Sequence, residues 1–202
     1  WPGGVINSRC VGIVSSRLRR DTEANAPVTQ ALRLSMTAID ACSERLVASA
    51  ETSLCEYIEK CGMLFEIPLF RVSATTEQTP STPWIEQLIQ PPSPDVGPAL
   101  LISPPATSQL RNDSTDTDDH SNILHGIPTR DRVVALLSQR LFVLTLRQNG
   151  NWWKILRAGF EDRLWNPGSV RTVVGNGLCA DQITAELQSM GAVRWYLDAD
   201  KD

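Results

Sequence analysis

The sequence predicts a protein of the α+β class, with a helical N-terminal region, a proline-rich extended middle and a compact C-terminal α-β-β-β-α-β unit. Three observations carry this prediction. Apolar residues recur every three or four positions along residues 27–61, the spacing of one helix face. Prolines cluster within residues 74–128. Residues 129–202 combine helical spacing with short β-rich runs and turn residues.

Residues 1–26 predict an N-terminal arm. Its apolar stretch, residues 11–14, is short, and several arginines follow it. A free segment of this kind has too little apolar surface to fold alone, because ordering the backbone costs about 1–2 kcal/mol per residue. We therefore expect the arm to pack on something else, such as another subunit.

Residues 27–73 predict a helical region followed by an edge strand. One uninterrupted helix over residues 27–61 would be ~50 Å long, so we place a break at the polar run of residues 49–53. Residues 64–73 read as a strand. Pro68 removes a backbone donor from that strand, which favours a position at the edge of a sheet.

Residues 74–128 predict an extended, proline-rich and acidic segment rather than a packed unit. Two short elements are embedded in it, a helical turn at residues 84–88 and a strand at residues 99–102. Structureless stretches of this length are uncommon inside compact domains. The segment is therefore expected to be a linker, or an arm that becomes ordered against its neighbours.

Residues 129–202 predict a compact α+β unit. A helix is expected over residues 129–140, and a β-hairpin over residues 141–157. The hairpin rests on Asn149-Gly150, a dipeptide that favours the type I′ turn between antiparallel strands. The remaining elements are expected to be a strand at residues 170–174, a helix at residues 180–190 and a strand at residues 193–197.

The strand–glycine–helix–strand order near the C-terminus carries one local motif. The motif is Gly175-Asn176-Gly177-Leu178-Cys179-Ala180, with Asp198 at the end of the following strand. It resembles the dinucleotide-binding βαβ fingerprint, in which glycines admit a pyrophosphate to a helix N-terminus. The resemblance implies that Gly175, Gly177, Ala180 and Asp198 contact an adenine nucleotide. The same pattern also describes a βαβ unit with no ligand.

Composition narrows the classes of partner. The 202 residues carry a net charge of −4 with a pI near 5.2. Nucleic-acid binders usually carry a basic excess, because neutralising phosphates supplies much of their affinity. We therefore expect no direct nucleic-acid signal. No apolar run reaches the ~20 residues of a membrane span, so no membrane association is expected.

The cysteines and the first residue bear on localisation. Five cysteines at scattered spacings do not form a disulfide framework, which indicates free thiols in a reducing intracellular compartment or within a particle. No signal peptide is visible. The sequence begins at Trp1, which suggests a cleavage product, an excised domain or an incomplete sequence.

The catalytic and metal-binding motifs that sequence can reveal are absent. The chain has no G-x-S-x-G, P-loop or H-E-x-x-H. Its two histidines, His120 and His125, lie in or beside the acidic loop and far from any cysteine pair. We therefore expect no metal site and no resident cofactor, and the chain is more readily understood as a non-enzyme.

These observations lead to two functional hypotheses. The first is a non-enzymatic structural subunit of a larger assembly, such as a proteolytically processed virion, capsid or organellar-complex component. Its partners would be other protein subunits in a homo- or hetero-oligomer, since the chain is rich in tryptophan and arginine, which are enriched in interfaces. The alternative is a nucleotide-binding module that uses the βαβ unit at residues 170–198.

Overall fold

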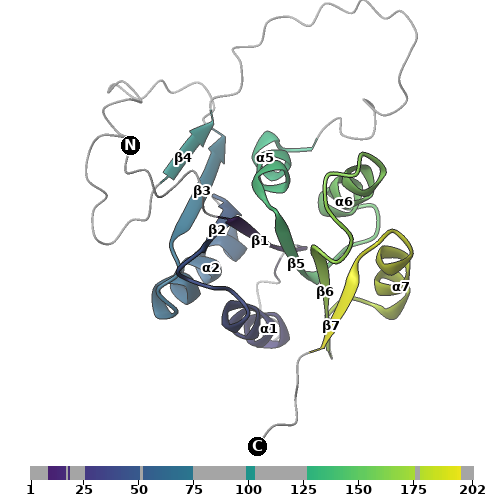
Figure 1. The fold of residues 1–202 in the computed structure, drawn as a ribbon, viewed down its shortest axis with the longest axis horizontal. Coiled ribbons are helices and arrows are strands. Elements are labelled where there is room, and N and C mark those ends of the chain that lie inside the picture. The colour runs from purple at the N-terminus through teal and green to yellow at the C-terminus, as the bar shows by residue number, and fades with distance from the viewer. Residues whose placement is uncertain are drawn as a thin grey trace, which may run out of the picture.

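The computed structural model describes residues 9–16, 18, 26–50, 52–74, 99–102, 127–175 and 178–196, and its described strands form one parallel sheet between helices (Figure 1). The strand order in this seven-stranded sheet is β4-β3-β2-β1-β5-β6-β7. The strands are β1 (Arg9–Ser15), β2 (Glu44–Ser49), β3 (Leu69–Ala74), β4 (Ala99–Ile102), β5 (Arg140–Thr145), β6 (Val170–Val174) and β7 (Val193–Tyr196). The helices are α1 (Ala26–Thr37), α2 (Ser53–Leu64), α5 (Thr129–Leu137), α6 (Asn151–Glu161) and α7 (Asp181–Ser189).

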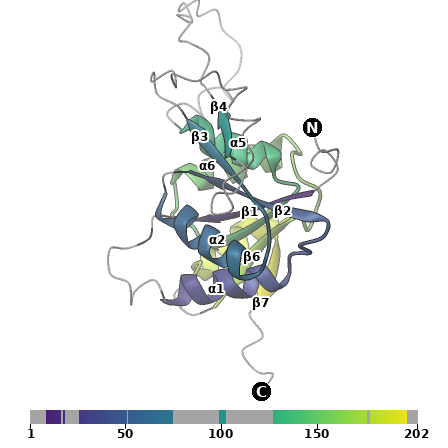
Figure 2. The same ribbon diagram turned by 90° about the vertical axis from the view of Figure 1, so that its left-hand side faces the viewer.

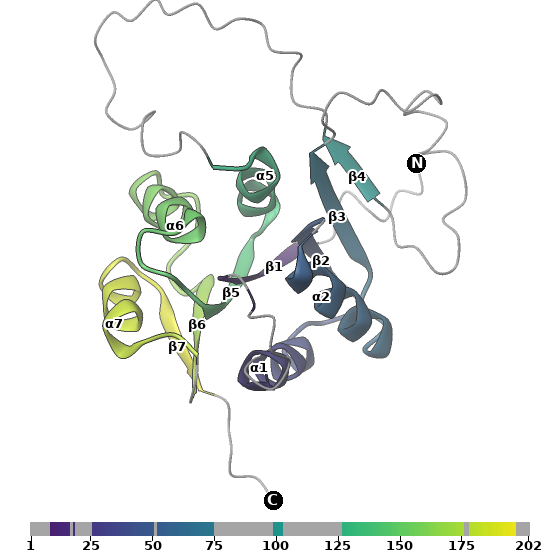
Figure 3. The same cartoon turned by 180° about the vertical axis from the view of Figure 1, so that it is seen from behind.

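The predicted α+β class is therefore wrong, and the fold is α/β. Each described strand pairs in parallel with its neighbour. Parallel strands need crossover connections, and these place helices on both faces of the sheet. Figure 2 shows α5 and α6 above β1 and β2, with α1 and α2 below them, and Figure 3 shows the same layers from behind.

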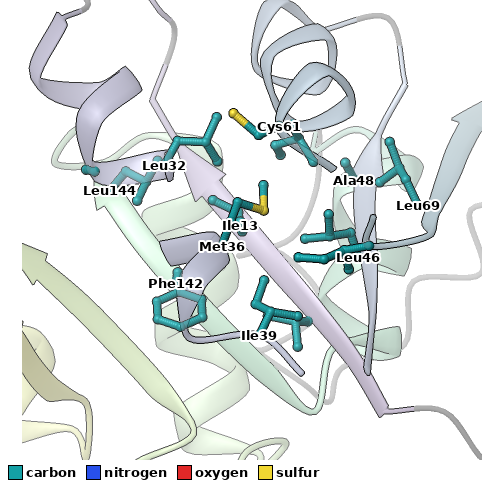
Figure 4. Close-up of a cluster of buried hydrophobic side chains, with 14 of the residues drawn as sticks. Ile13, Leu32, Met36, Ile39, Leu46, Ala48, Cys61, Leu69, Phe142 and Leu144 are labelled. Atoms are coloured by element: carbon teal, nitrogen blue, oxygen red, sulfur yellow. The ribbon is translucent and has the colours of Figure 1, made fainter. Parts of the chain in front are cut away.

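Two hydrophobic cores separate the sheet from its helix layers. Side chains from β1, β2, β5 and the helices α1 and α2 form the first core, part of which is drawn in Figure 4. The second core lies between the sheet and helices α6 and α7, and a smaller cluster lies under α5. The sheet is thus buried on both faces over most of its width.

The predicted N-terminal arm contains the central strand of the sheet. In β1, Val11 aligns with Leu46 of β2 and with Arg140 of β5, and it is fully buried. A strand that is covered on both faces has a short continuous apolar run instead of an alternating pattern. Residues 11–14 show such a run, and their shortness led to the wrong expectation of an arm.

The predicted long helix contains a strand. Leu46, Val47 and Ala48 of β2 are all buried, and periodicity alone does not distinguish such a run from a buried helix segment. The expected break at residues 49–53 is the junction between β2 and α2. There, the Thr52 side chain accepts a hydrogen bond from the Cys55 amide and caps α2.

The strand predicted over residues 64–73 is interior rather than at an edge. The strand β3 begins at Leu69, after Pro68, and it pairs with both β2 and β4. Pro68 lies before the strand, where its missing donor costs nothing. Its carbonyl accepts a hydrogen bond from the Leu46 amide, 2.8 Å away.

The predicted β-hairpin at Asn149-Gly150 is also wrong, because β5 leads through a short loop into helix α6. Asn149 does adopt a left-handed conformation (φ 61°), as the dipeptide suggested. However, the buried residues of the next segment include Trp153, Leu156 and Gly159, which follow helical spacing. A strand would have placed Arg157 on the same face as Trp153.

Other elements agree with their predicted positions. The strands at residues 99–102 and 170–174 are present with these bounds, and α5, α7 and β7 lie within their predicted ranges. The helical turn expected at residues 84–88 and the acidic loop with His120 and His125 lie outside the described residues. Among the residues that the structure describes, no helix is long and apolar enough to cross a membrane.

Candidate functional site at the carboxyl edge of the sheet

The strand order changes direction between β1 and β5, at the centre of the sheet. From β1 the chain passes through α1 to β2 on one side, and from β5 it passes through α6 to β6 on the other. Because these connections leave in opposite directions, the carboxyl ends of β1 and β5 form the topological switch point of the sheet, the position that is called the crevice in open α/β folds. Ligands of open α/β sheets usually bind at such a switch point.

A pair of hydroxyl groups lies at this crevice. The Ser15 Oγ and Thr145 Oγ1 atoms are 2.6 Å apart, and either hydroxyl is able to donate the hydrogen bond. The Ser16 amide donates to the Thr145 carbonyl at 2.9 Å and approaches Thr145 Oγ1 at 3.2 Å. The strand register shifts between Val14 and Ser15, and this irregularity brings Ser15 opposite Thr145.

The N-terminus of α6 borders the same crevice. Its N-cap residue is Gly150, which offers no side chain for capping, and the first amide bonded to the helix cap is that of Lys154. Within the described part of the chain, the amides of residues 151–153 therefore have no hydrogen-bond partner. Such amides, together with the helix dipole, attract anions.

Helix α1 also begins at this edge and has no acidic residue in its first turn, but the residues just before it lie outside the described part of the chain. The three other helices that begin here are less suited to an anion. The first turn of α2 is capped by Thr52 and contains Glu56. The first turns of α5 and α7 contain Asp131 and Asp181, respectively. The first turn of α6 contains no acidic residue. Charge and capping together therefore favour α6 over α2, α5 and α7 as an anion-binding helix.

A buried carboxyl group anchors α5 next to the crevice. Ser49, the last residue of β2, donates a hydrogen bond from its Oγ to Asp131 Oδ1 at 2.6 Å. Asp131 is only 8% exposed. Burial raises the pKa of Asp131, while the bond from Ser49 and the positive charge of Arg130 oppose this increase. The contact fixes the first turn of α5 over the end of β2.

The structure places part of the sequence-predicted nucleotide site on the same edge. Gly175 follows β6 and Ala180 is the N-cap of α7, and both are exposed. The Leu178 amide donates to the Gly175 carbonyl at 3.2 Å, and β6 and β7 are parallel, as the fingerprint requires. Gly177 and Asp198 lie outside the described residues. Nucleotide binding by these residues stays a prediction.

The central residues of the crevice were not found from the sequence. Ser15 and Thr145 are 130 residues apart, and each is one hydroxyl among many. The available signal was that each ends a buried apolar run, in positions where parallel strands present side chains to a ligand. The sequence pattern around Gly150 predicts a hairpin turn and does not indicate the helix N-terminus that the structure has there.

Two other site types can be placed relative to the crevice. Among the described residues, no group of three or more His, Cys, Asp or Glu side chains is arranged to hold a metal ion. An open hollow of about 430 Å³ lies between the C-terminal halves of α6 and α7, lined by residues such as Arg157, Phe160 and Met190. It lies toward the opposite ends of the strands and does not adjoin the crevice.

Comparison with known proteins shows similarity of fold without similarity of sequence. No protein-family model and no curated protein matches the sequence. DNA processing protein A from Helicobacter pylori, described for its single-stranded DNA binding mode, matches with a TM-score of 0.52 and 11% identity. The match covers 95% of this chain and 78% of that protein.

Other solved structures share the fold to the same degree. DNA processing protein A from Streptococcus pneumoniae matches with a TM-score of 0.52 and 15% identity, over 93% of this chain and 58% of that protein. The molybdenum cofactor carrier protein from Chlamydomonas reinhardtii matches with a TM-score of 0.53 and 9% identity. That match covers 93% of this chain and 88% of the carrier protein.

These similarities correct the leading functional hypothesis. The expectation of a structural assembly subunit, such as a virion or capsid component with other protein subunits as its partners, is wrong. The α/β fold is instead shared with a protein that is described as binding single-stranded DNA. The expectation of no nucleic-acid signal is corrected by the same finding. It rested on the net charge of the whole chain, which does not report the local charge at the crevice.

Proposed function

We propose that the chain binds single-stranded nucleic acid by holding a backbone phosphate in the crevice between β1 and β5. The observation that carries this proposal is that the Ser15–Thr145 hydroxyl pair and the uncapped N-terminus of α6 lie at the same carboxyl edge, with the short loop of residues 146–150 between Thr145 and α6. DNA processing protein A from Helicobacter pylori, which is described for its single-stranded DNA binding mode, has a similar fold, and this supports the choice of ligand.

The chemistry of the crevice suits a phosphate. Hydroxyl groups and free amides donate hydrogen bonds to phosphate oxygens, and bonds to charged groups contribute about 1.5–3 kcal/mol each. The groups that form the crevice, on Ser15, Ser16, Thr145 and Gly150, are uncharged. The first turn of α6 contains no acidic residue, so no carboxylate of that turn repels a phosphate.

A free nucleotide is the second candidate ligand, and a separate observation favours it. The β6–α7–β7 unit has the parallel geometry of a dinucleotide-binding βαβ unit, and Gly175 and Ala180 are exposed at its turn. Asp181 in the first turn of α7 weakens the attraction for a phosphate at that helix. For this reason we place the nucleotide second.

Fluorescence anisotropy with a labelled single-stranded oligonucleotide tests the proposal. The variant Thr145→Val keeps the shape of the side chain and removes its hydroxyl. Loss of one hydrogen bond to a phosphate should weaken binding by about tenfold or more. The matched control is Thr184→Val, which removes a buried hydroxyl that bonds the Ala180 carbonyl within α7.

The outcomes separate the candidates. Weaker binding by Thr145→Val alone supports the crevice. Equal binding by wild type and both variants contradicts it. A third outcome would replace the proposal with the nucleotide site at β6–α7. In that case free adenosine monophosphate competes at concentrations similar to those of the oligonucleotide. Gly175→Glu abolishes this competition, and Thr145→Val does not affect it.

A further inference from the structure

A second group of basic residues lies at the opposite ends of the strands, away from the crevice. Arg9, Arg140 and Arg171 occupy the amino ends of the adjacent strands β1, β5 and β6. Side chains alternate between the two faces of a strand. Val11, Phe142 and Val173, two residues after each arginine, all belong to the core on the α1 side, so the three arginines share that face.

These three arginines carry more positive charge than the acidic residue paired with them balances. Arg140 Nη2 lies 2.7 Å from Glu44 Oε2 and also donates to the Ala38 carbonyl at 2.9 Å. Arg9 is exposed and Arg171 is half-buried, and neither forms an ion pair with another described residue. Burial lowers the pKa of Arg140, Glu44 opposes this, and the positive charges of Arg171 and Arg9 lower it further. The guanidinium groups are thus close enough to repel one another.

Aromatic rings lie among these arginines. The Cζ atoms of Arg140 and Arg171 are 5.2 Å and 5.7 Å from the centroid of the Phe142 ring. The Phe142 ring is fully buried, and the half-buried Trp195 lies 5.0 Å from it at an interplanar angle of 58°. Trp195 aligns with Val173 across β6 and β7, so it belongs to the same face.

Among the described helices, α1 is the one that contacts the sheet next to this face, through β5. Helix α7 contacts β6 and β7 from the opposite face. Figure 1 shows α1 below β5 and α7 on the other side of β6 and β7. Val193, which starts β7 on the arginine face, is 41% exposed. An elongated ligand therefore has access to Arg171 and Trp195.

We propose that Arg9, Arg171 and Trp195 form a second contact surface for a single-stranded polynucleotide. The guanidinium groups would contact backbone phosphates and the indole would stack with a base, a combination found in sequence-tolerant strand binding. Arg140 holds the group in place through Glu44 and Phe142. Six residue steps of β1 separate Arg9 from Ser15 of the crevice, a distance of about 20 Å. Only a ligand several nucleotides long reaches both.

The test compares oligothymidylates of about three and about 20 nucleotides, lengths below and above the ~4–16 nucleotides that a single-strand site usually covers. The full chain carries Arg9→Gln with Arg171→Gln. The control carries Arg33→Gln with Lys60→Gln, two exposed residues of α1 and α2 with the same total charge. Binding is measured by anisotropy over a range of salt concentrations.

Removal of two phosphate contacts should reduce the slope of log K against log salt by about 1.4, because each contact to a single strand contributes about 0.7. This reduction is expected for the long strand only, and not in the control. Arg171 lies over the buried Phe142 ring, so its loss could also disturb packing. The variant Arg171→Lys provides a second test, because it keeps the positive charge. If the fold is intact, it should keep the slope of log K against log salt.

Several results would overturn the inference. One is a salt slope that is unchanged in the Arg9→Gln, Arg171→Gln variant, and another is an equal change of slope in the control variant. A third is an equal loss of affinity for the short and the long oligonucleotide. The fourth is that polyglutamate displaces the long oligonucleotide as effectively as nucleic acid does. If the crevice proposal were wrong, the results would differ. Thr145→Val would leave the affinity for the short oligonucleotide unchanged, whereas the Arg9→Gln, Arg171→Gln variant would still bind the long oligonucleotide more weakly.

Discussion

Replacement of Gly150 by aspartate is expected to stabilise the fold and to weaken phosphate binding at the same time. Gly150 has φ −74° and ψ 170°, a conformation that any residue adopts at an N-cap. An added Cβ would lie 3.1 Å from the Arg147 carbonyl oxygen and 3.4 Å from Arg147 Cβ, in an exposed loop that is able to shift slightly. The new carboxylate would cap α6 and interact favourably with its dipole. We expect a gain of about 0.5–1 kcal/mol in the free energy of unfolding.

The same carboxylate should oppose the ligand in two ways. Its oxygens accept hydrogen bonds from the amides of residues 152 and 153, the groups assigned to the phosphate. Its charge also repels a phosphate about 4 Å away by roughly 1 kcal/mol in bulk water and roughly 4 kcal/mol at the effective dielectric constant of a protein surface. A loss of affinity of tenfold or more is therefore expected.

Urea unfolding and fluorescence anisotropy measure the two effects separately. Gly150→Asn is the matched control, because it provides the same cap without the charge and should weaken binding less than Gly150→Asp. Opposite signs for stability and binding exclude unfolding as the cause of weaker binding. A Gly150→Asp protein that is more stable and binds the oligonucleotide as well as wild type would refute the assignment of α6.

Three further predictions concern the scaffold. Thr172→Val should raise the free energy of unfolding by about 1 kcal/mol in urea titrations, because Thr172 Oγ1 is buried without a hydrogen-bond partner among the described residues; a loss of stability would contradict this. Gly159→Ala should lower the free energy of unfolding by about 1–3 kcal/mol, because the new Cβ would lie 2.2 Å from the Trp165 ring. Unchanged stability would contradict this and would mean that the ring shifts without cost. Asp131→Asn should remove part of the pH dependence of the free energy of unfolding. Burial raises the pKa of Asp131 above 3.8, so the folded state binds this proton more tightly than the unfolded state does. The wild type should therefore lose stability relative to the variant as the pH rises from below 3.8 through the raised pKa. Parallel stability curves from pH 3 to 7 would contradict this.

The sequence predicted the fold best where the signal was local. The segment from Val170 to Tyr196 has a strand, a glycine turn, an amphipathic helix and a second strand, and the structure shows this order in parallel geometry. In such a unit the apolar spacing and the turn residues agree with the final fold. Nearby packing alone specifies each of its elements.

The missed elements depend on contacts distant in sequence. The apolar run at Val11 becomes a central strand only because β2 and β5 flank it, and Leu46 lies in a strand although its spacing also fits a helix. The Asn149-Gly150 dipeptide fits both a hairpin and a strand-to-helix turn, and the helical burial of the following residues decides between them. Local propensity is overruled by tertiary packing at these positions.

The candidate site was hidden for the same reason. The bond between Ser15 and Thr145 joins strands that become neighbours only when the strand order is known. A serine or threonine after an apolar run is common, so neither residue stands out alone. The acidic net charge misled the choice of ligand, because binding depends on the few groups that line the crevice.

Backbone amide chemical shifts, recorded by NMR during titration with a single-stranded oligonucleotide, test the central claim most directly. The account predicts that the largest changes occur at Ser16, Thr145 and the amides of residues 151–153, and that they saturate together. Changes concentrated at Gly175 and the start of α7, or in the hollow between α6 and α7, with the crevice amides unchanged, would contradict it.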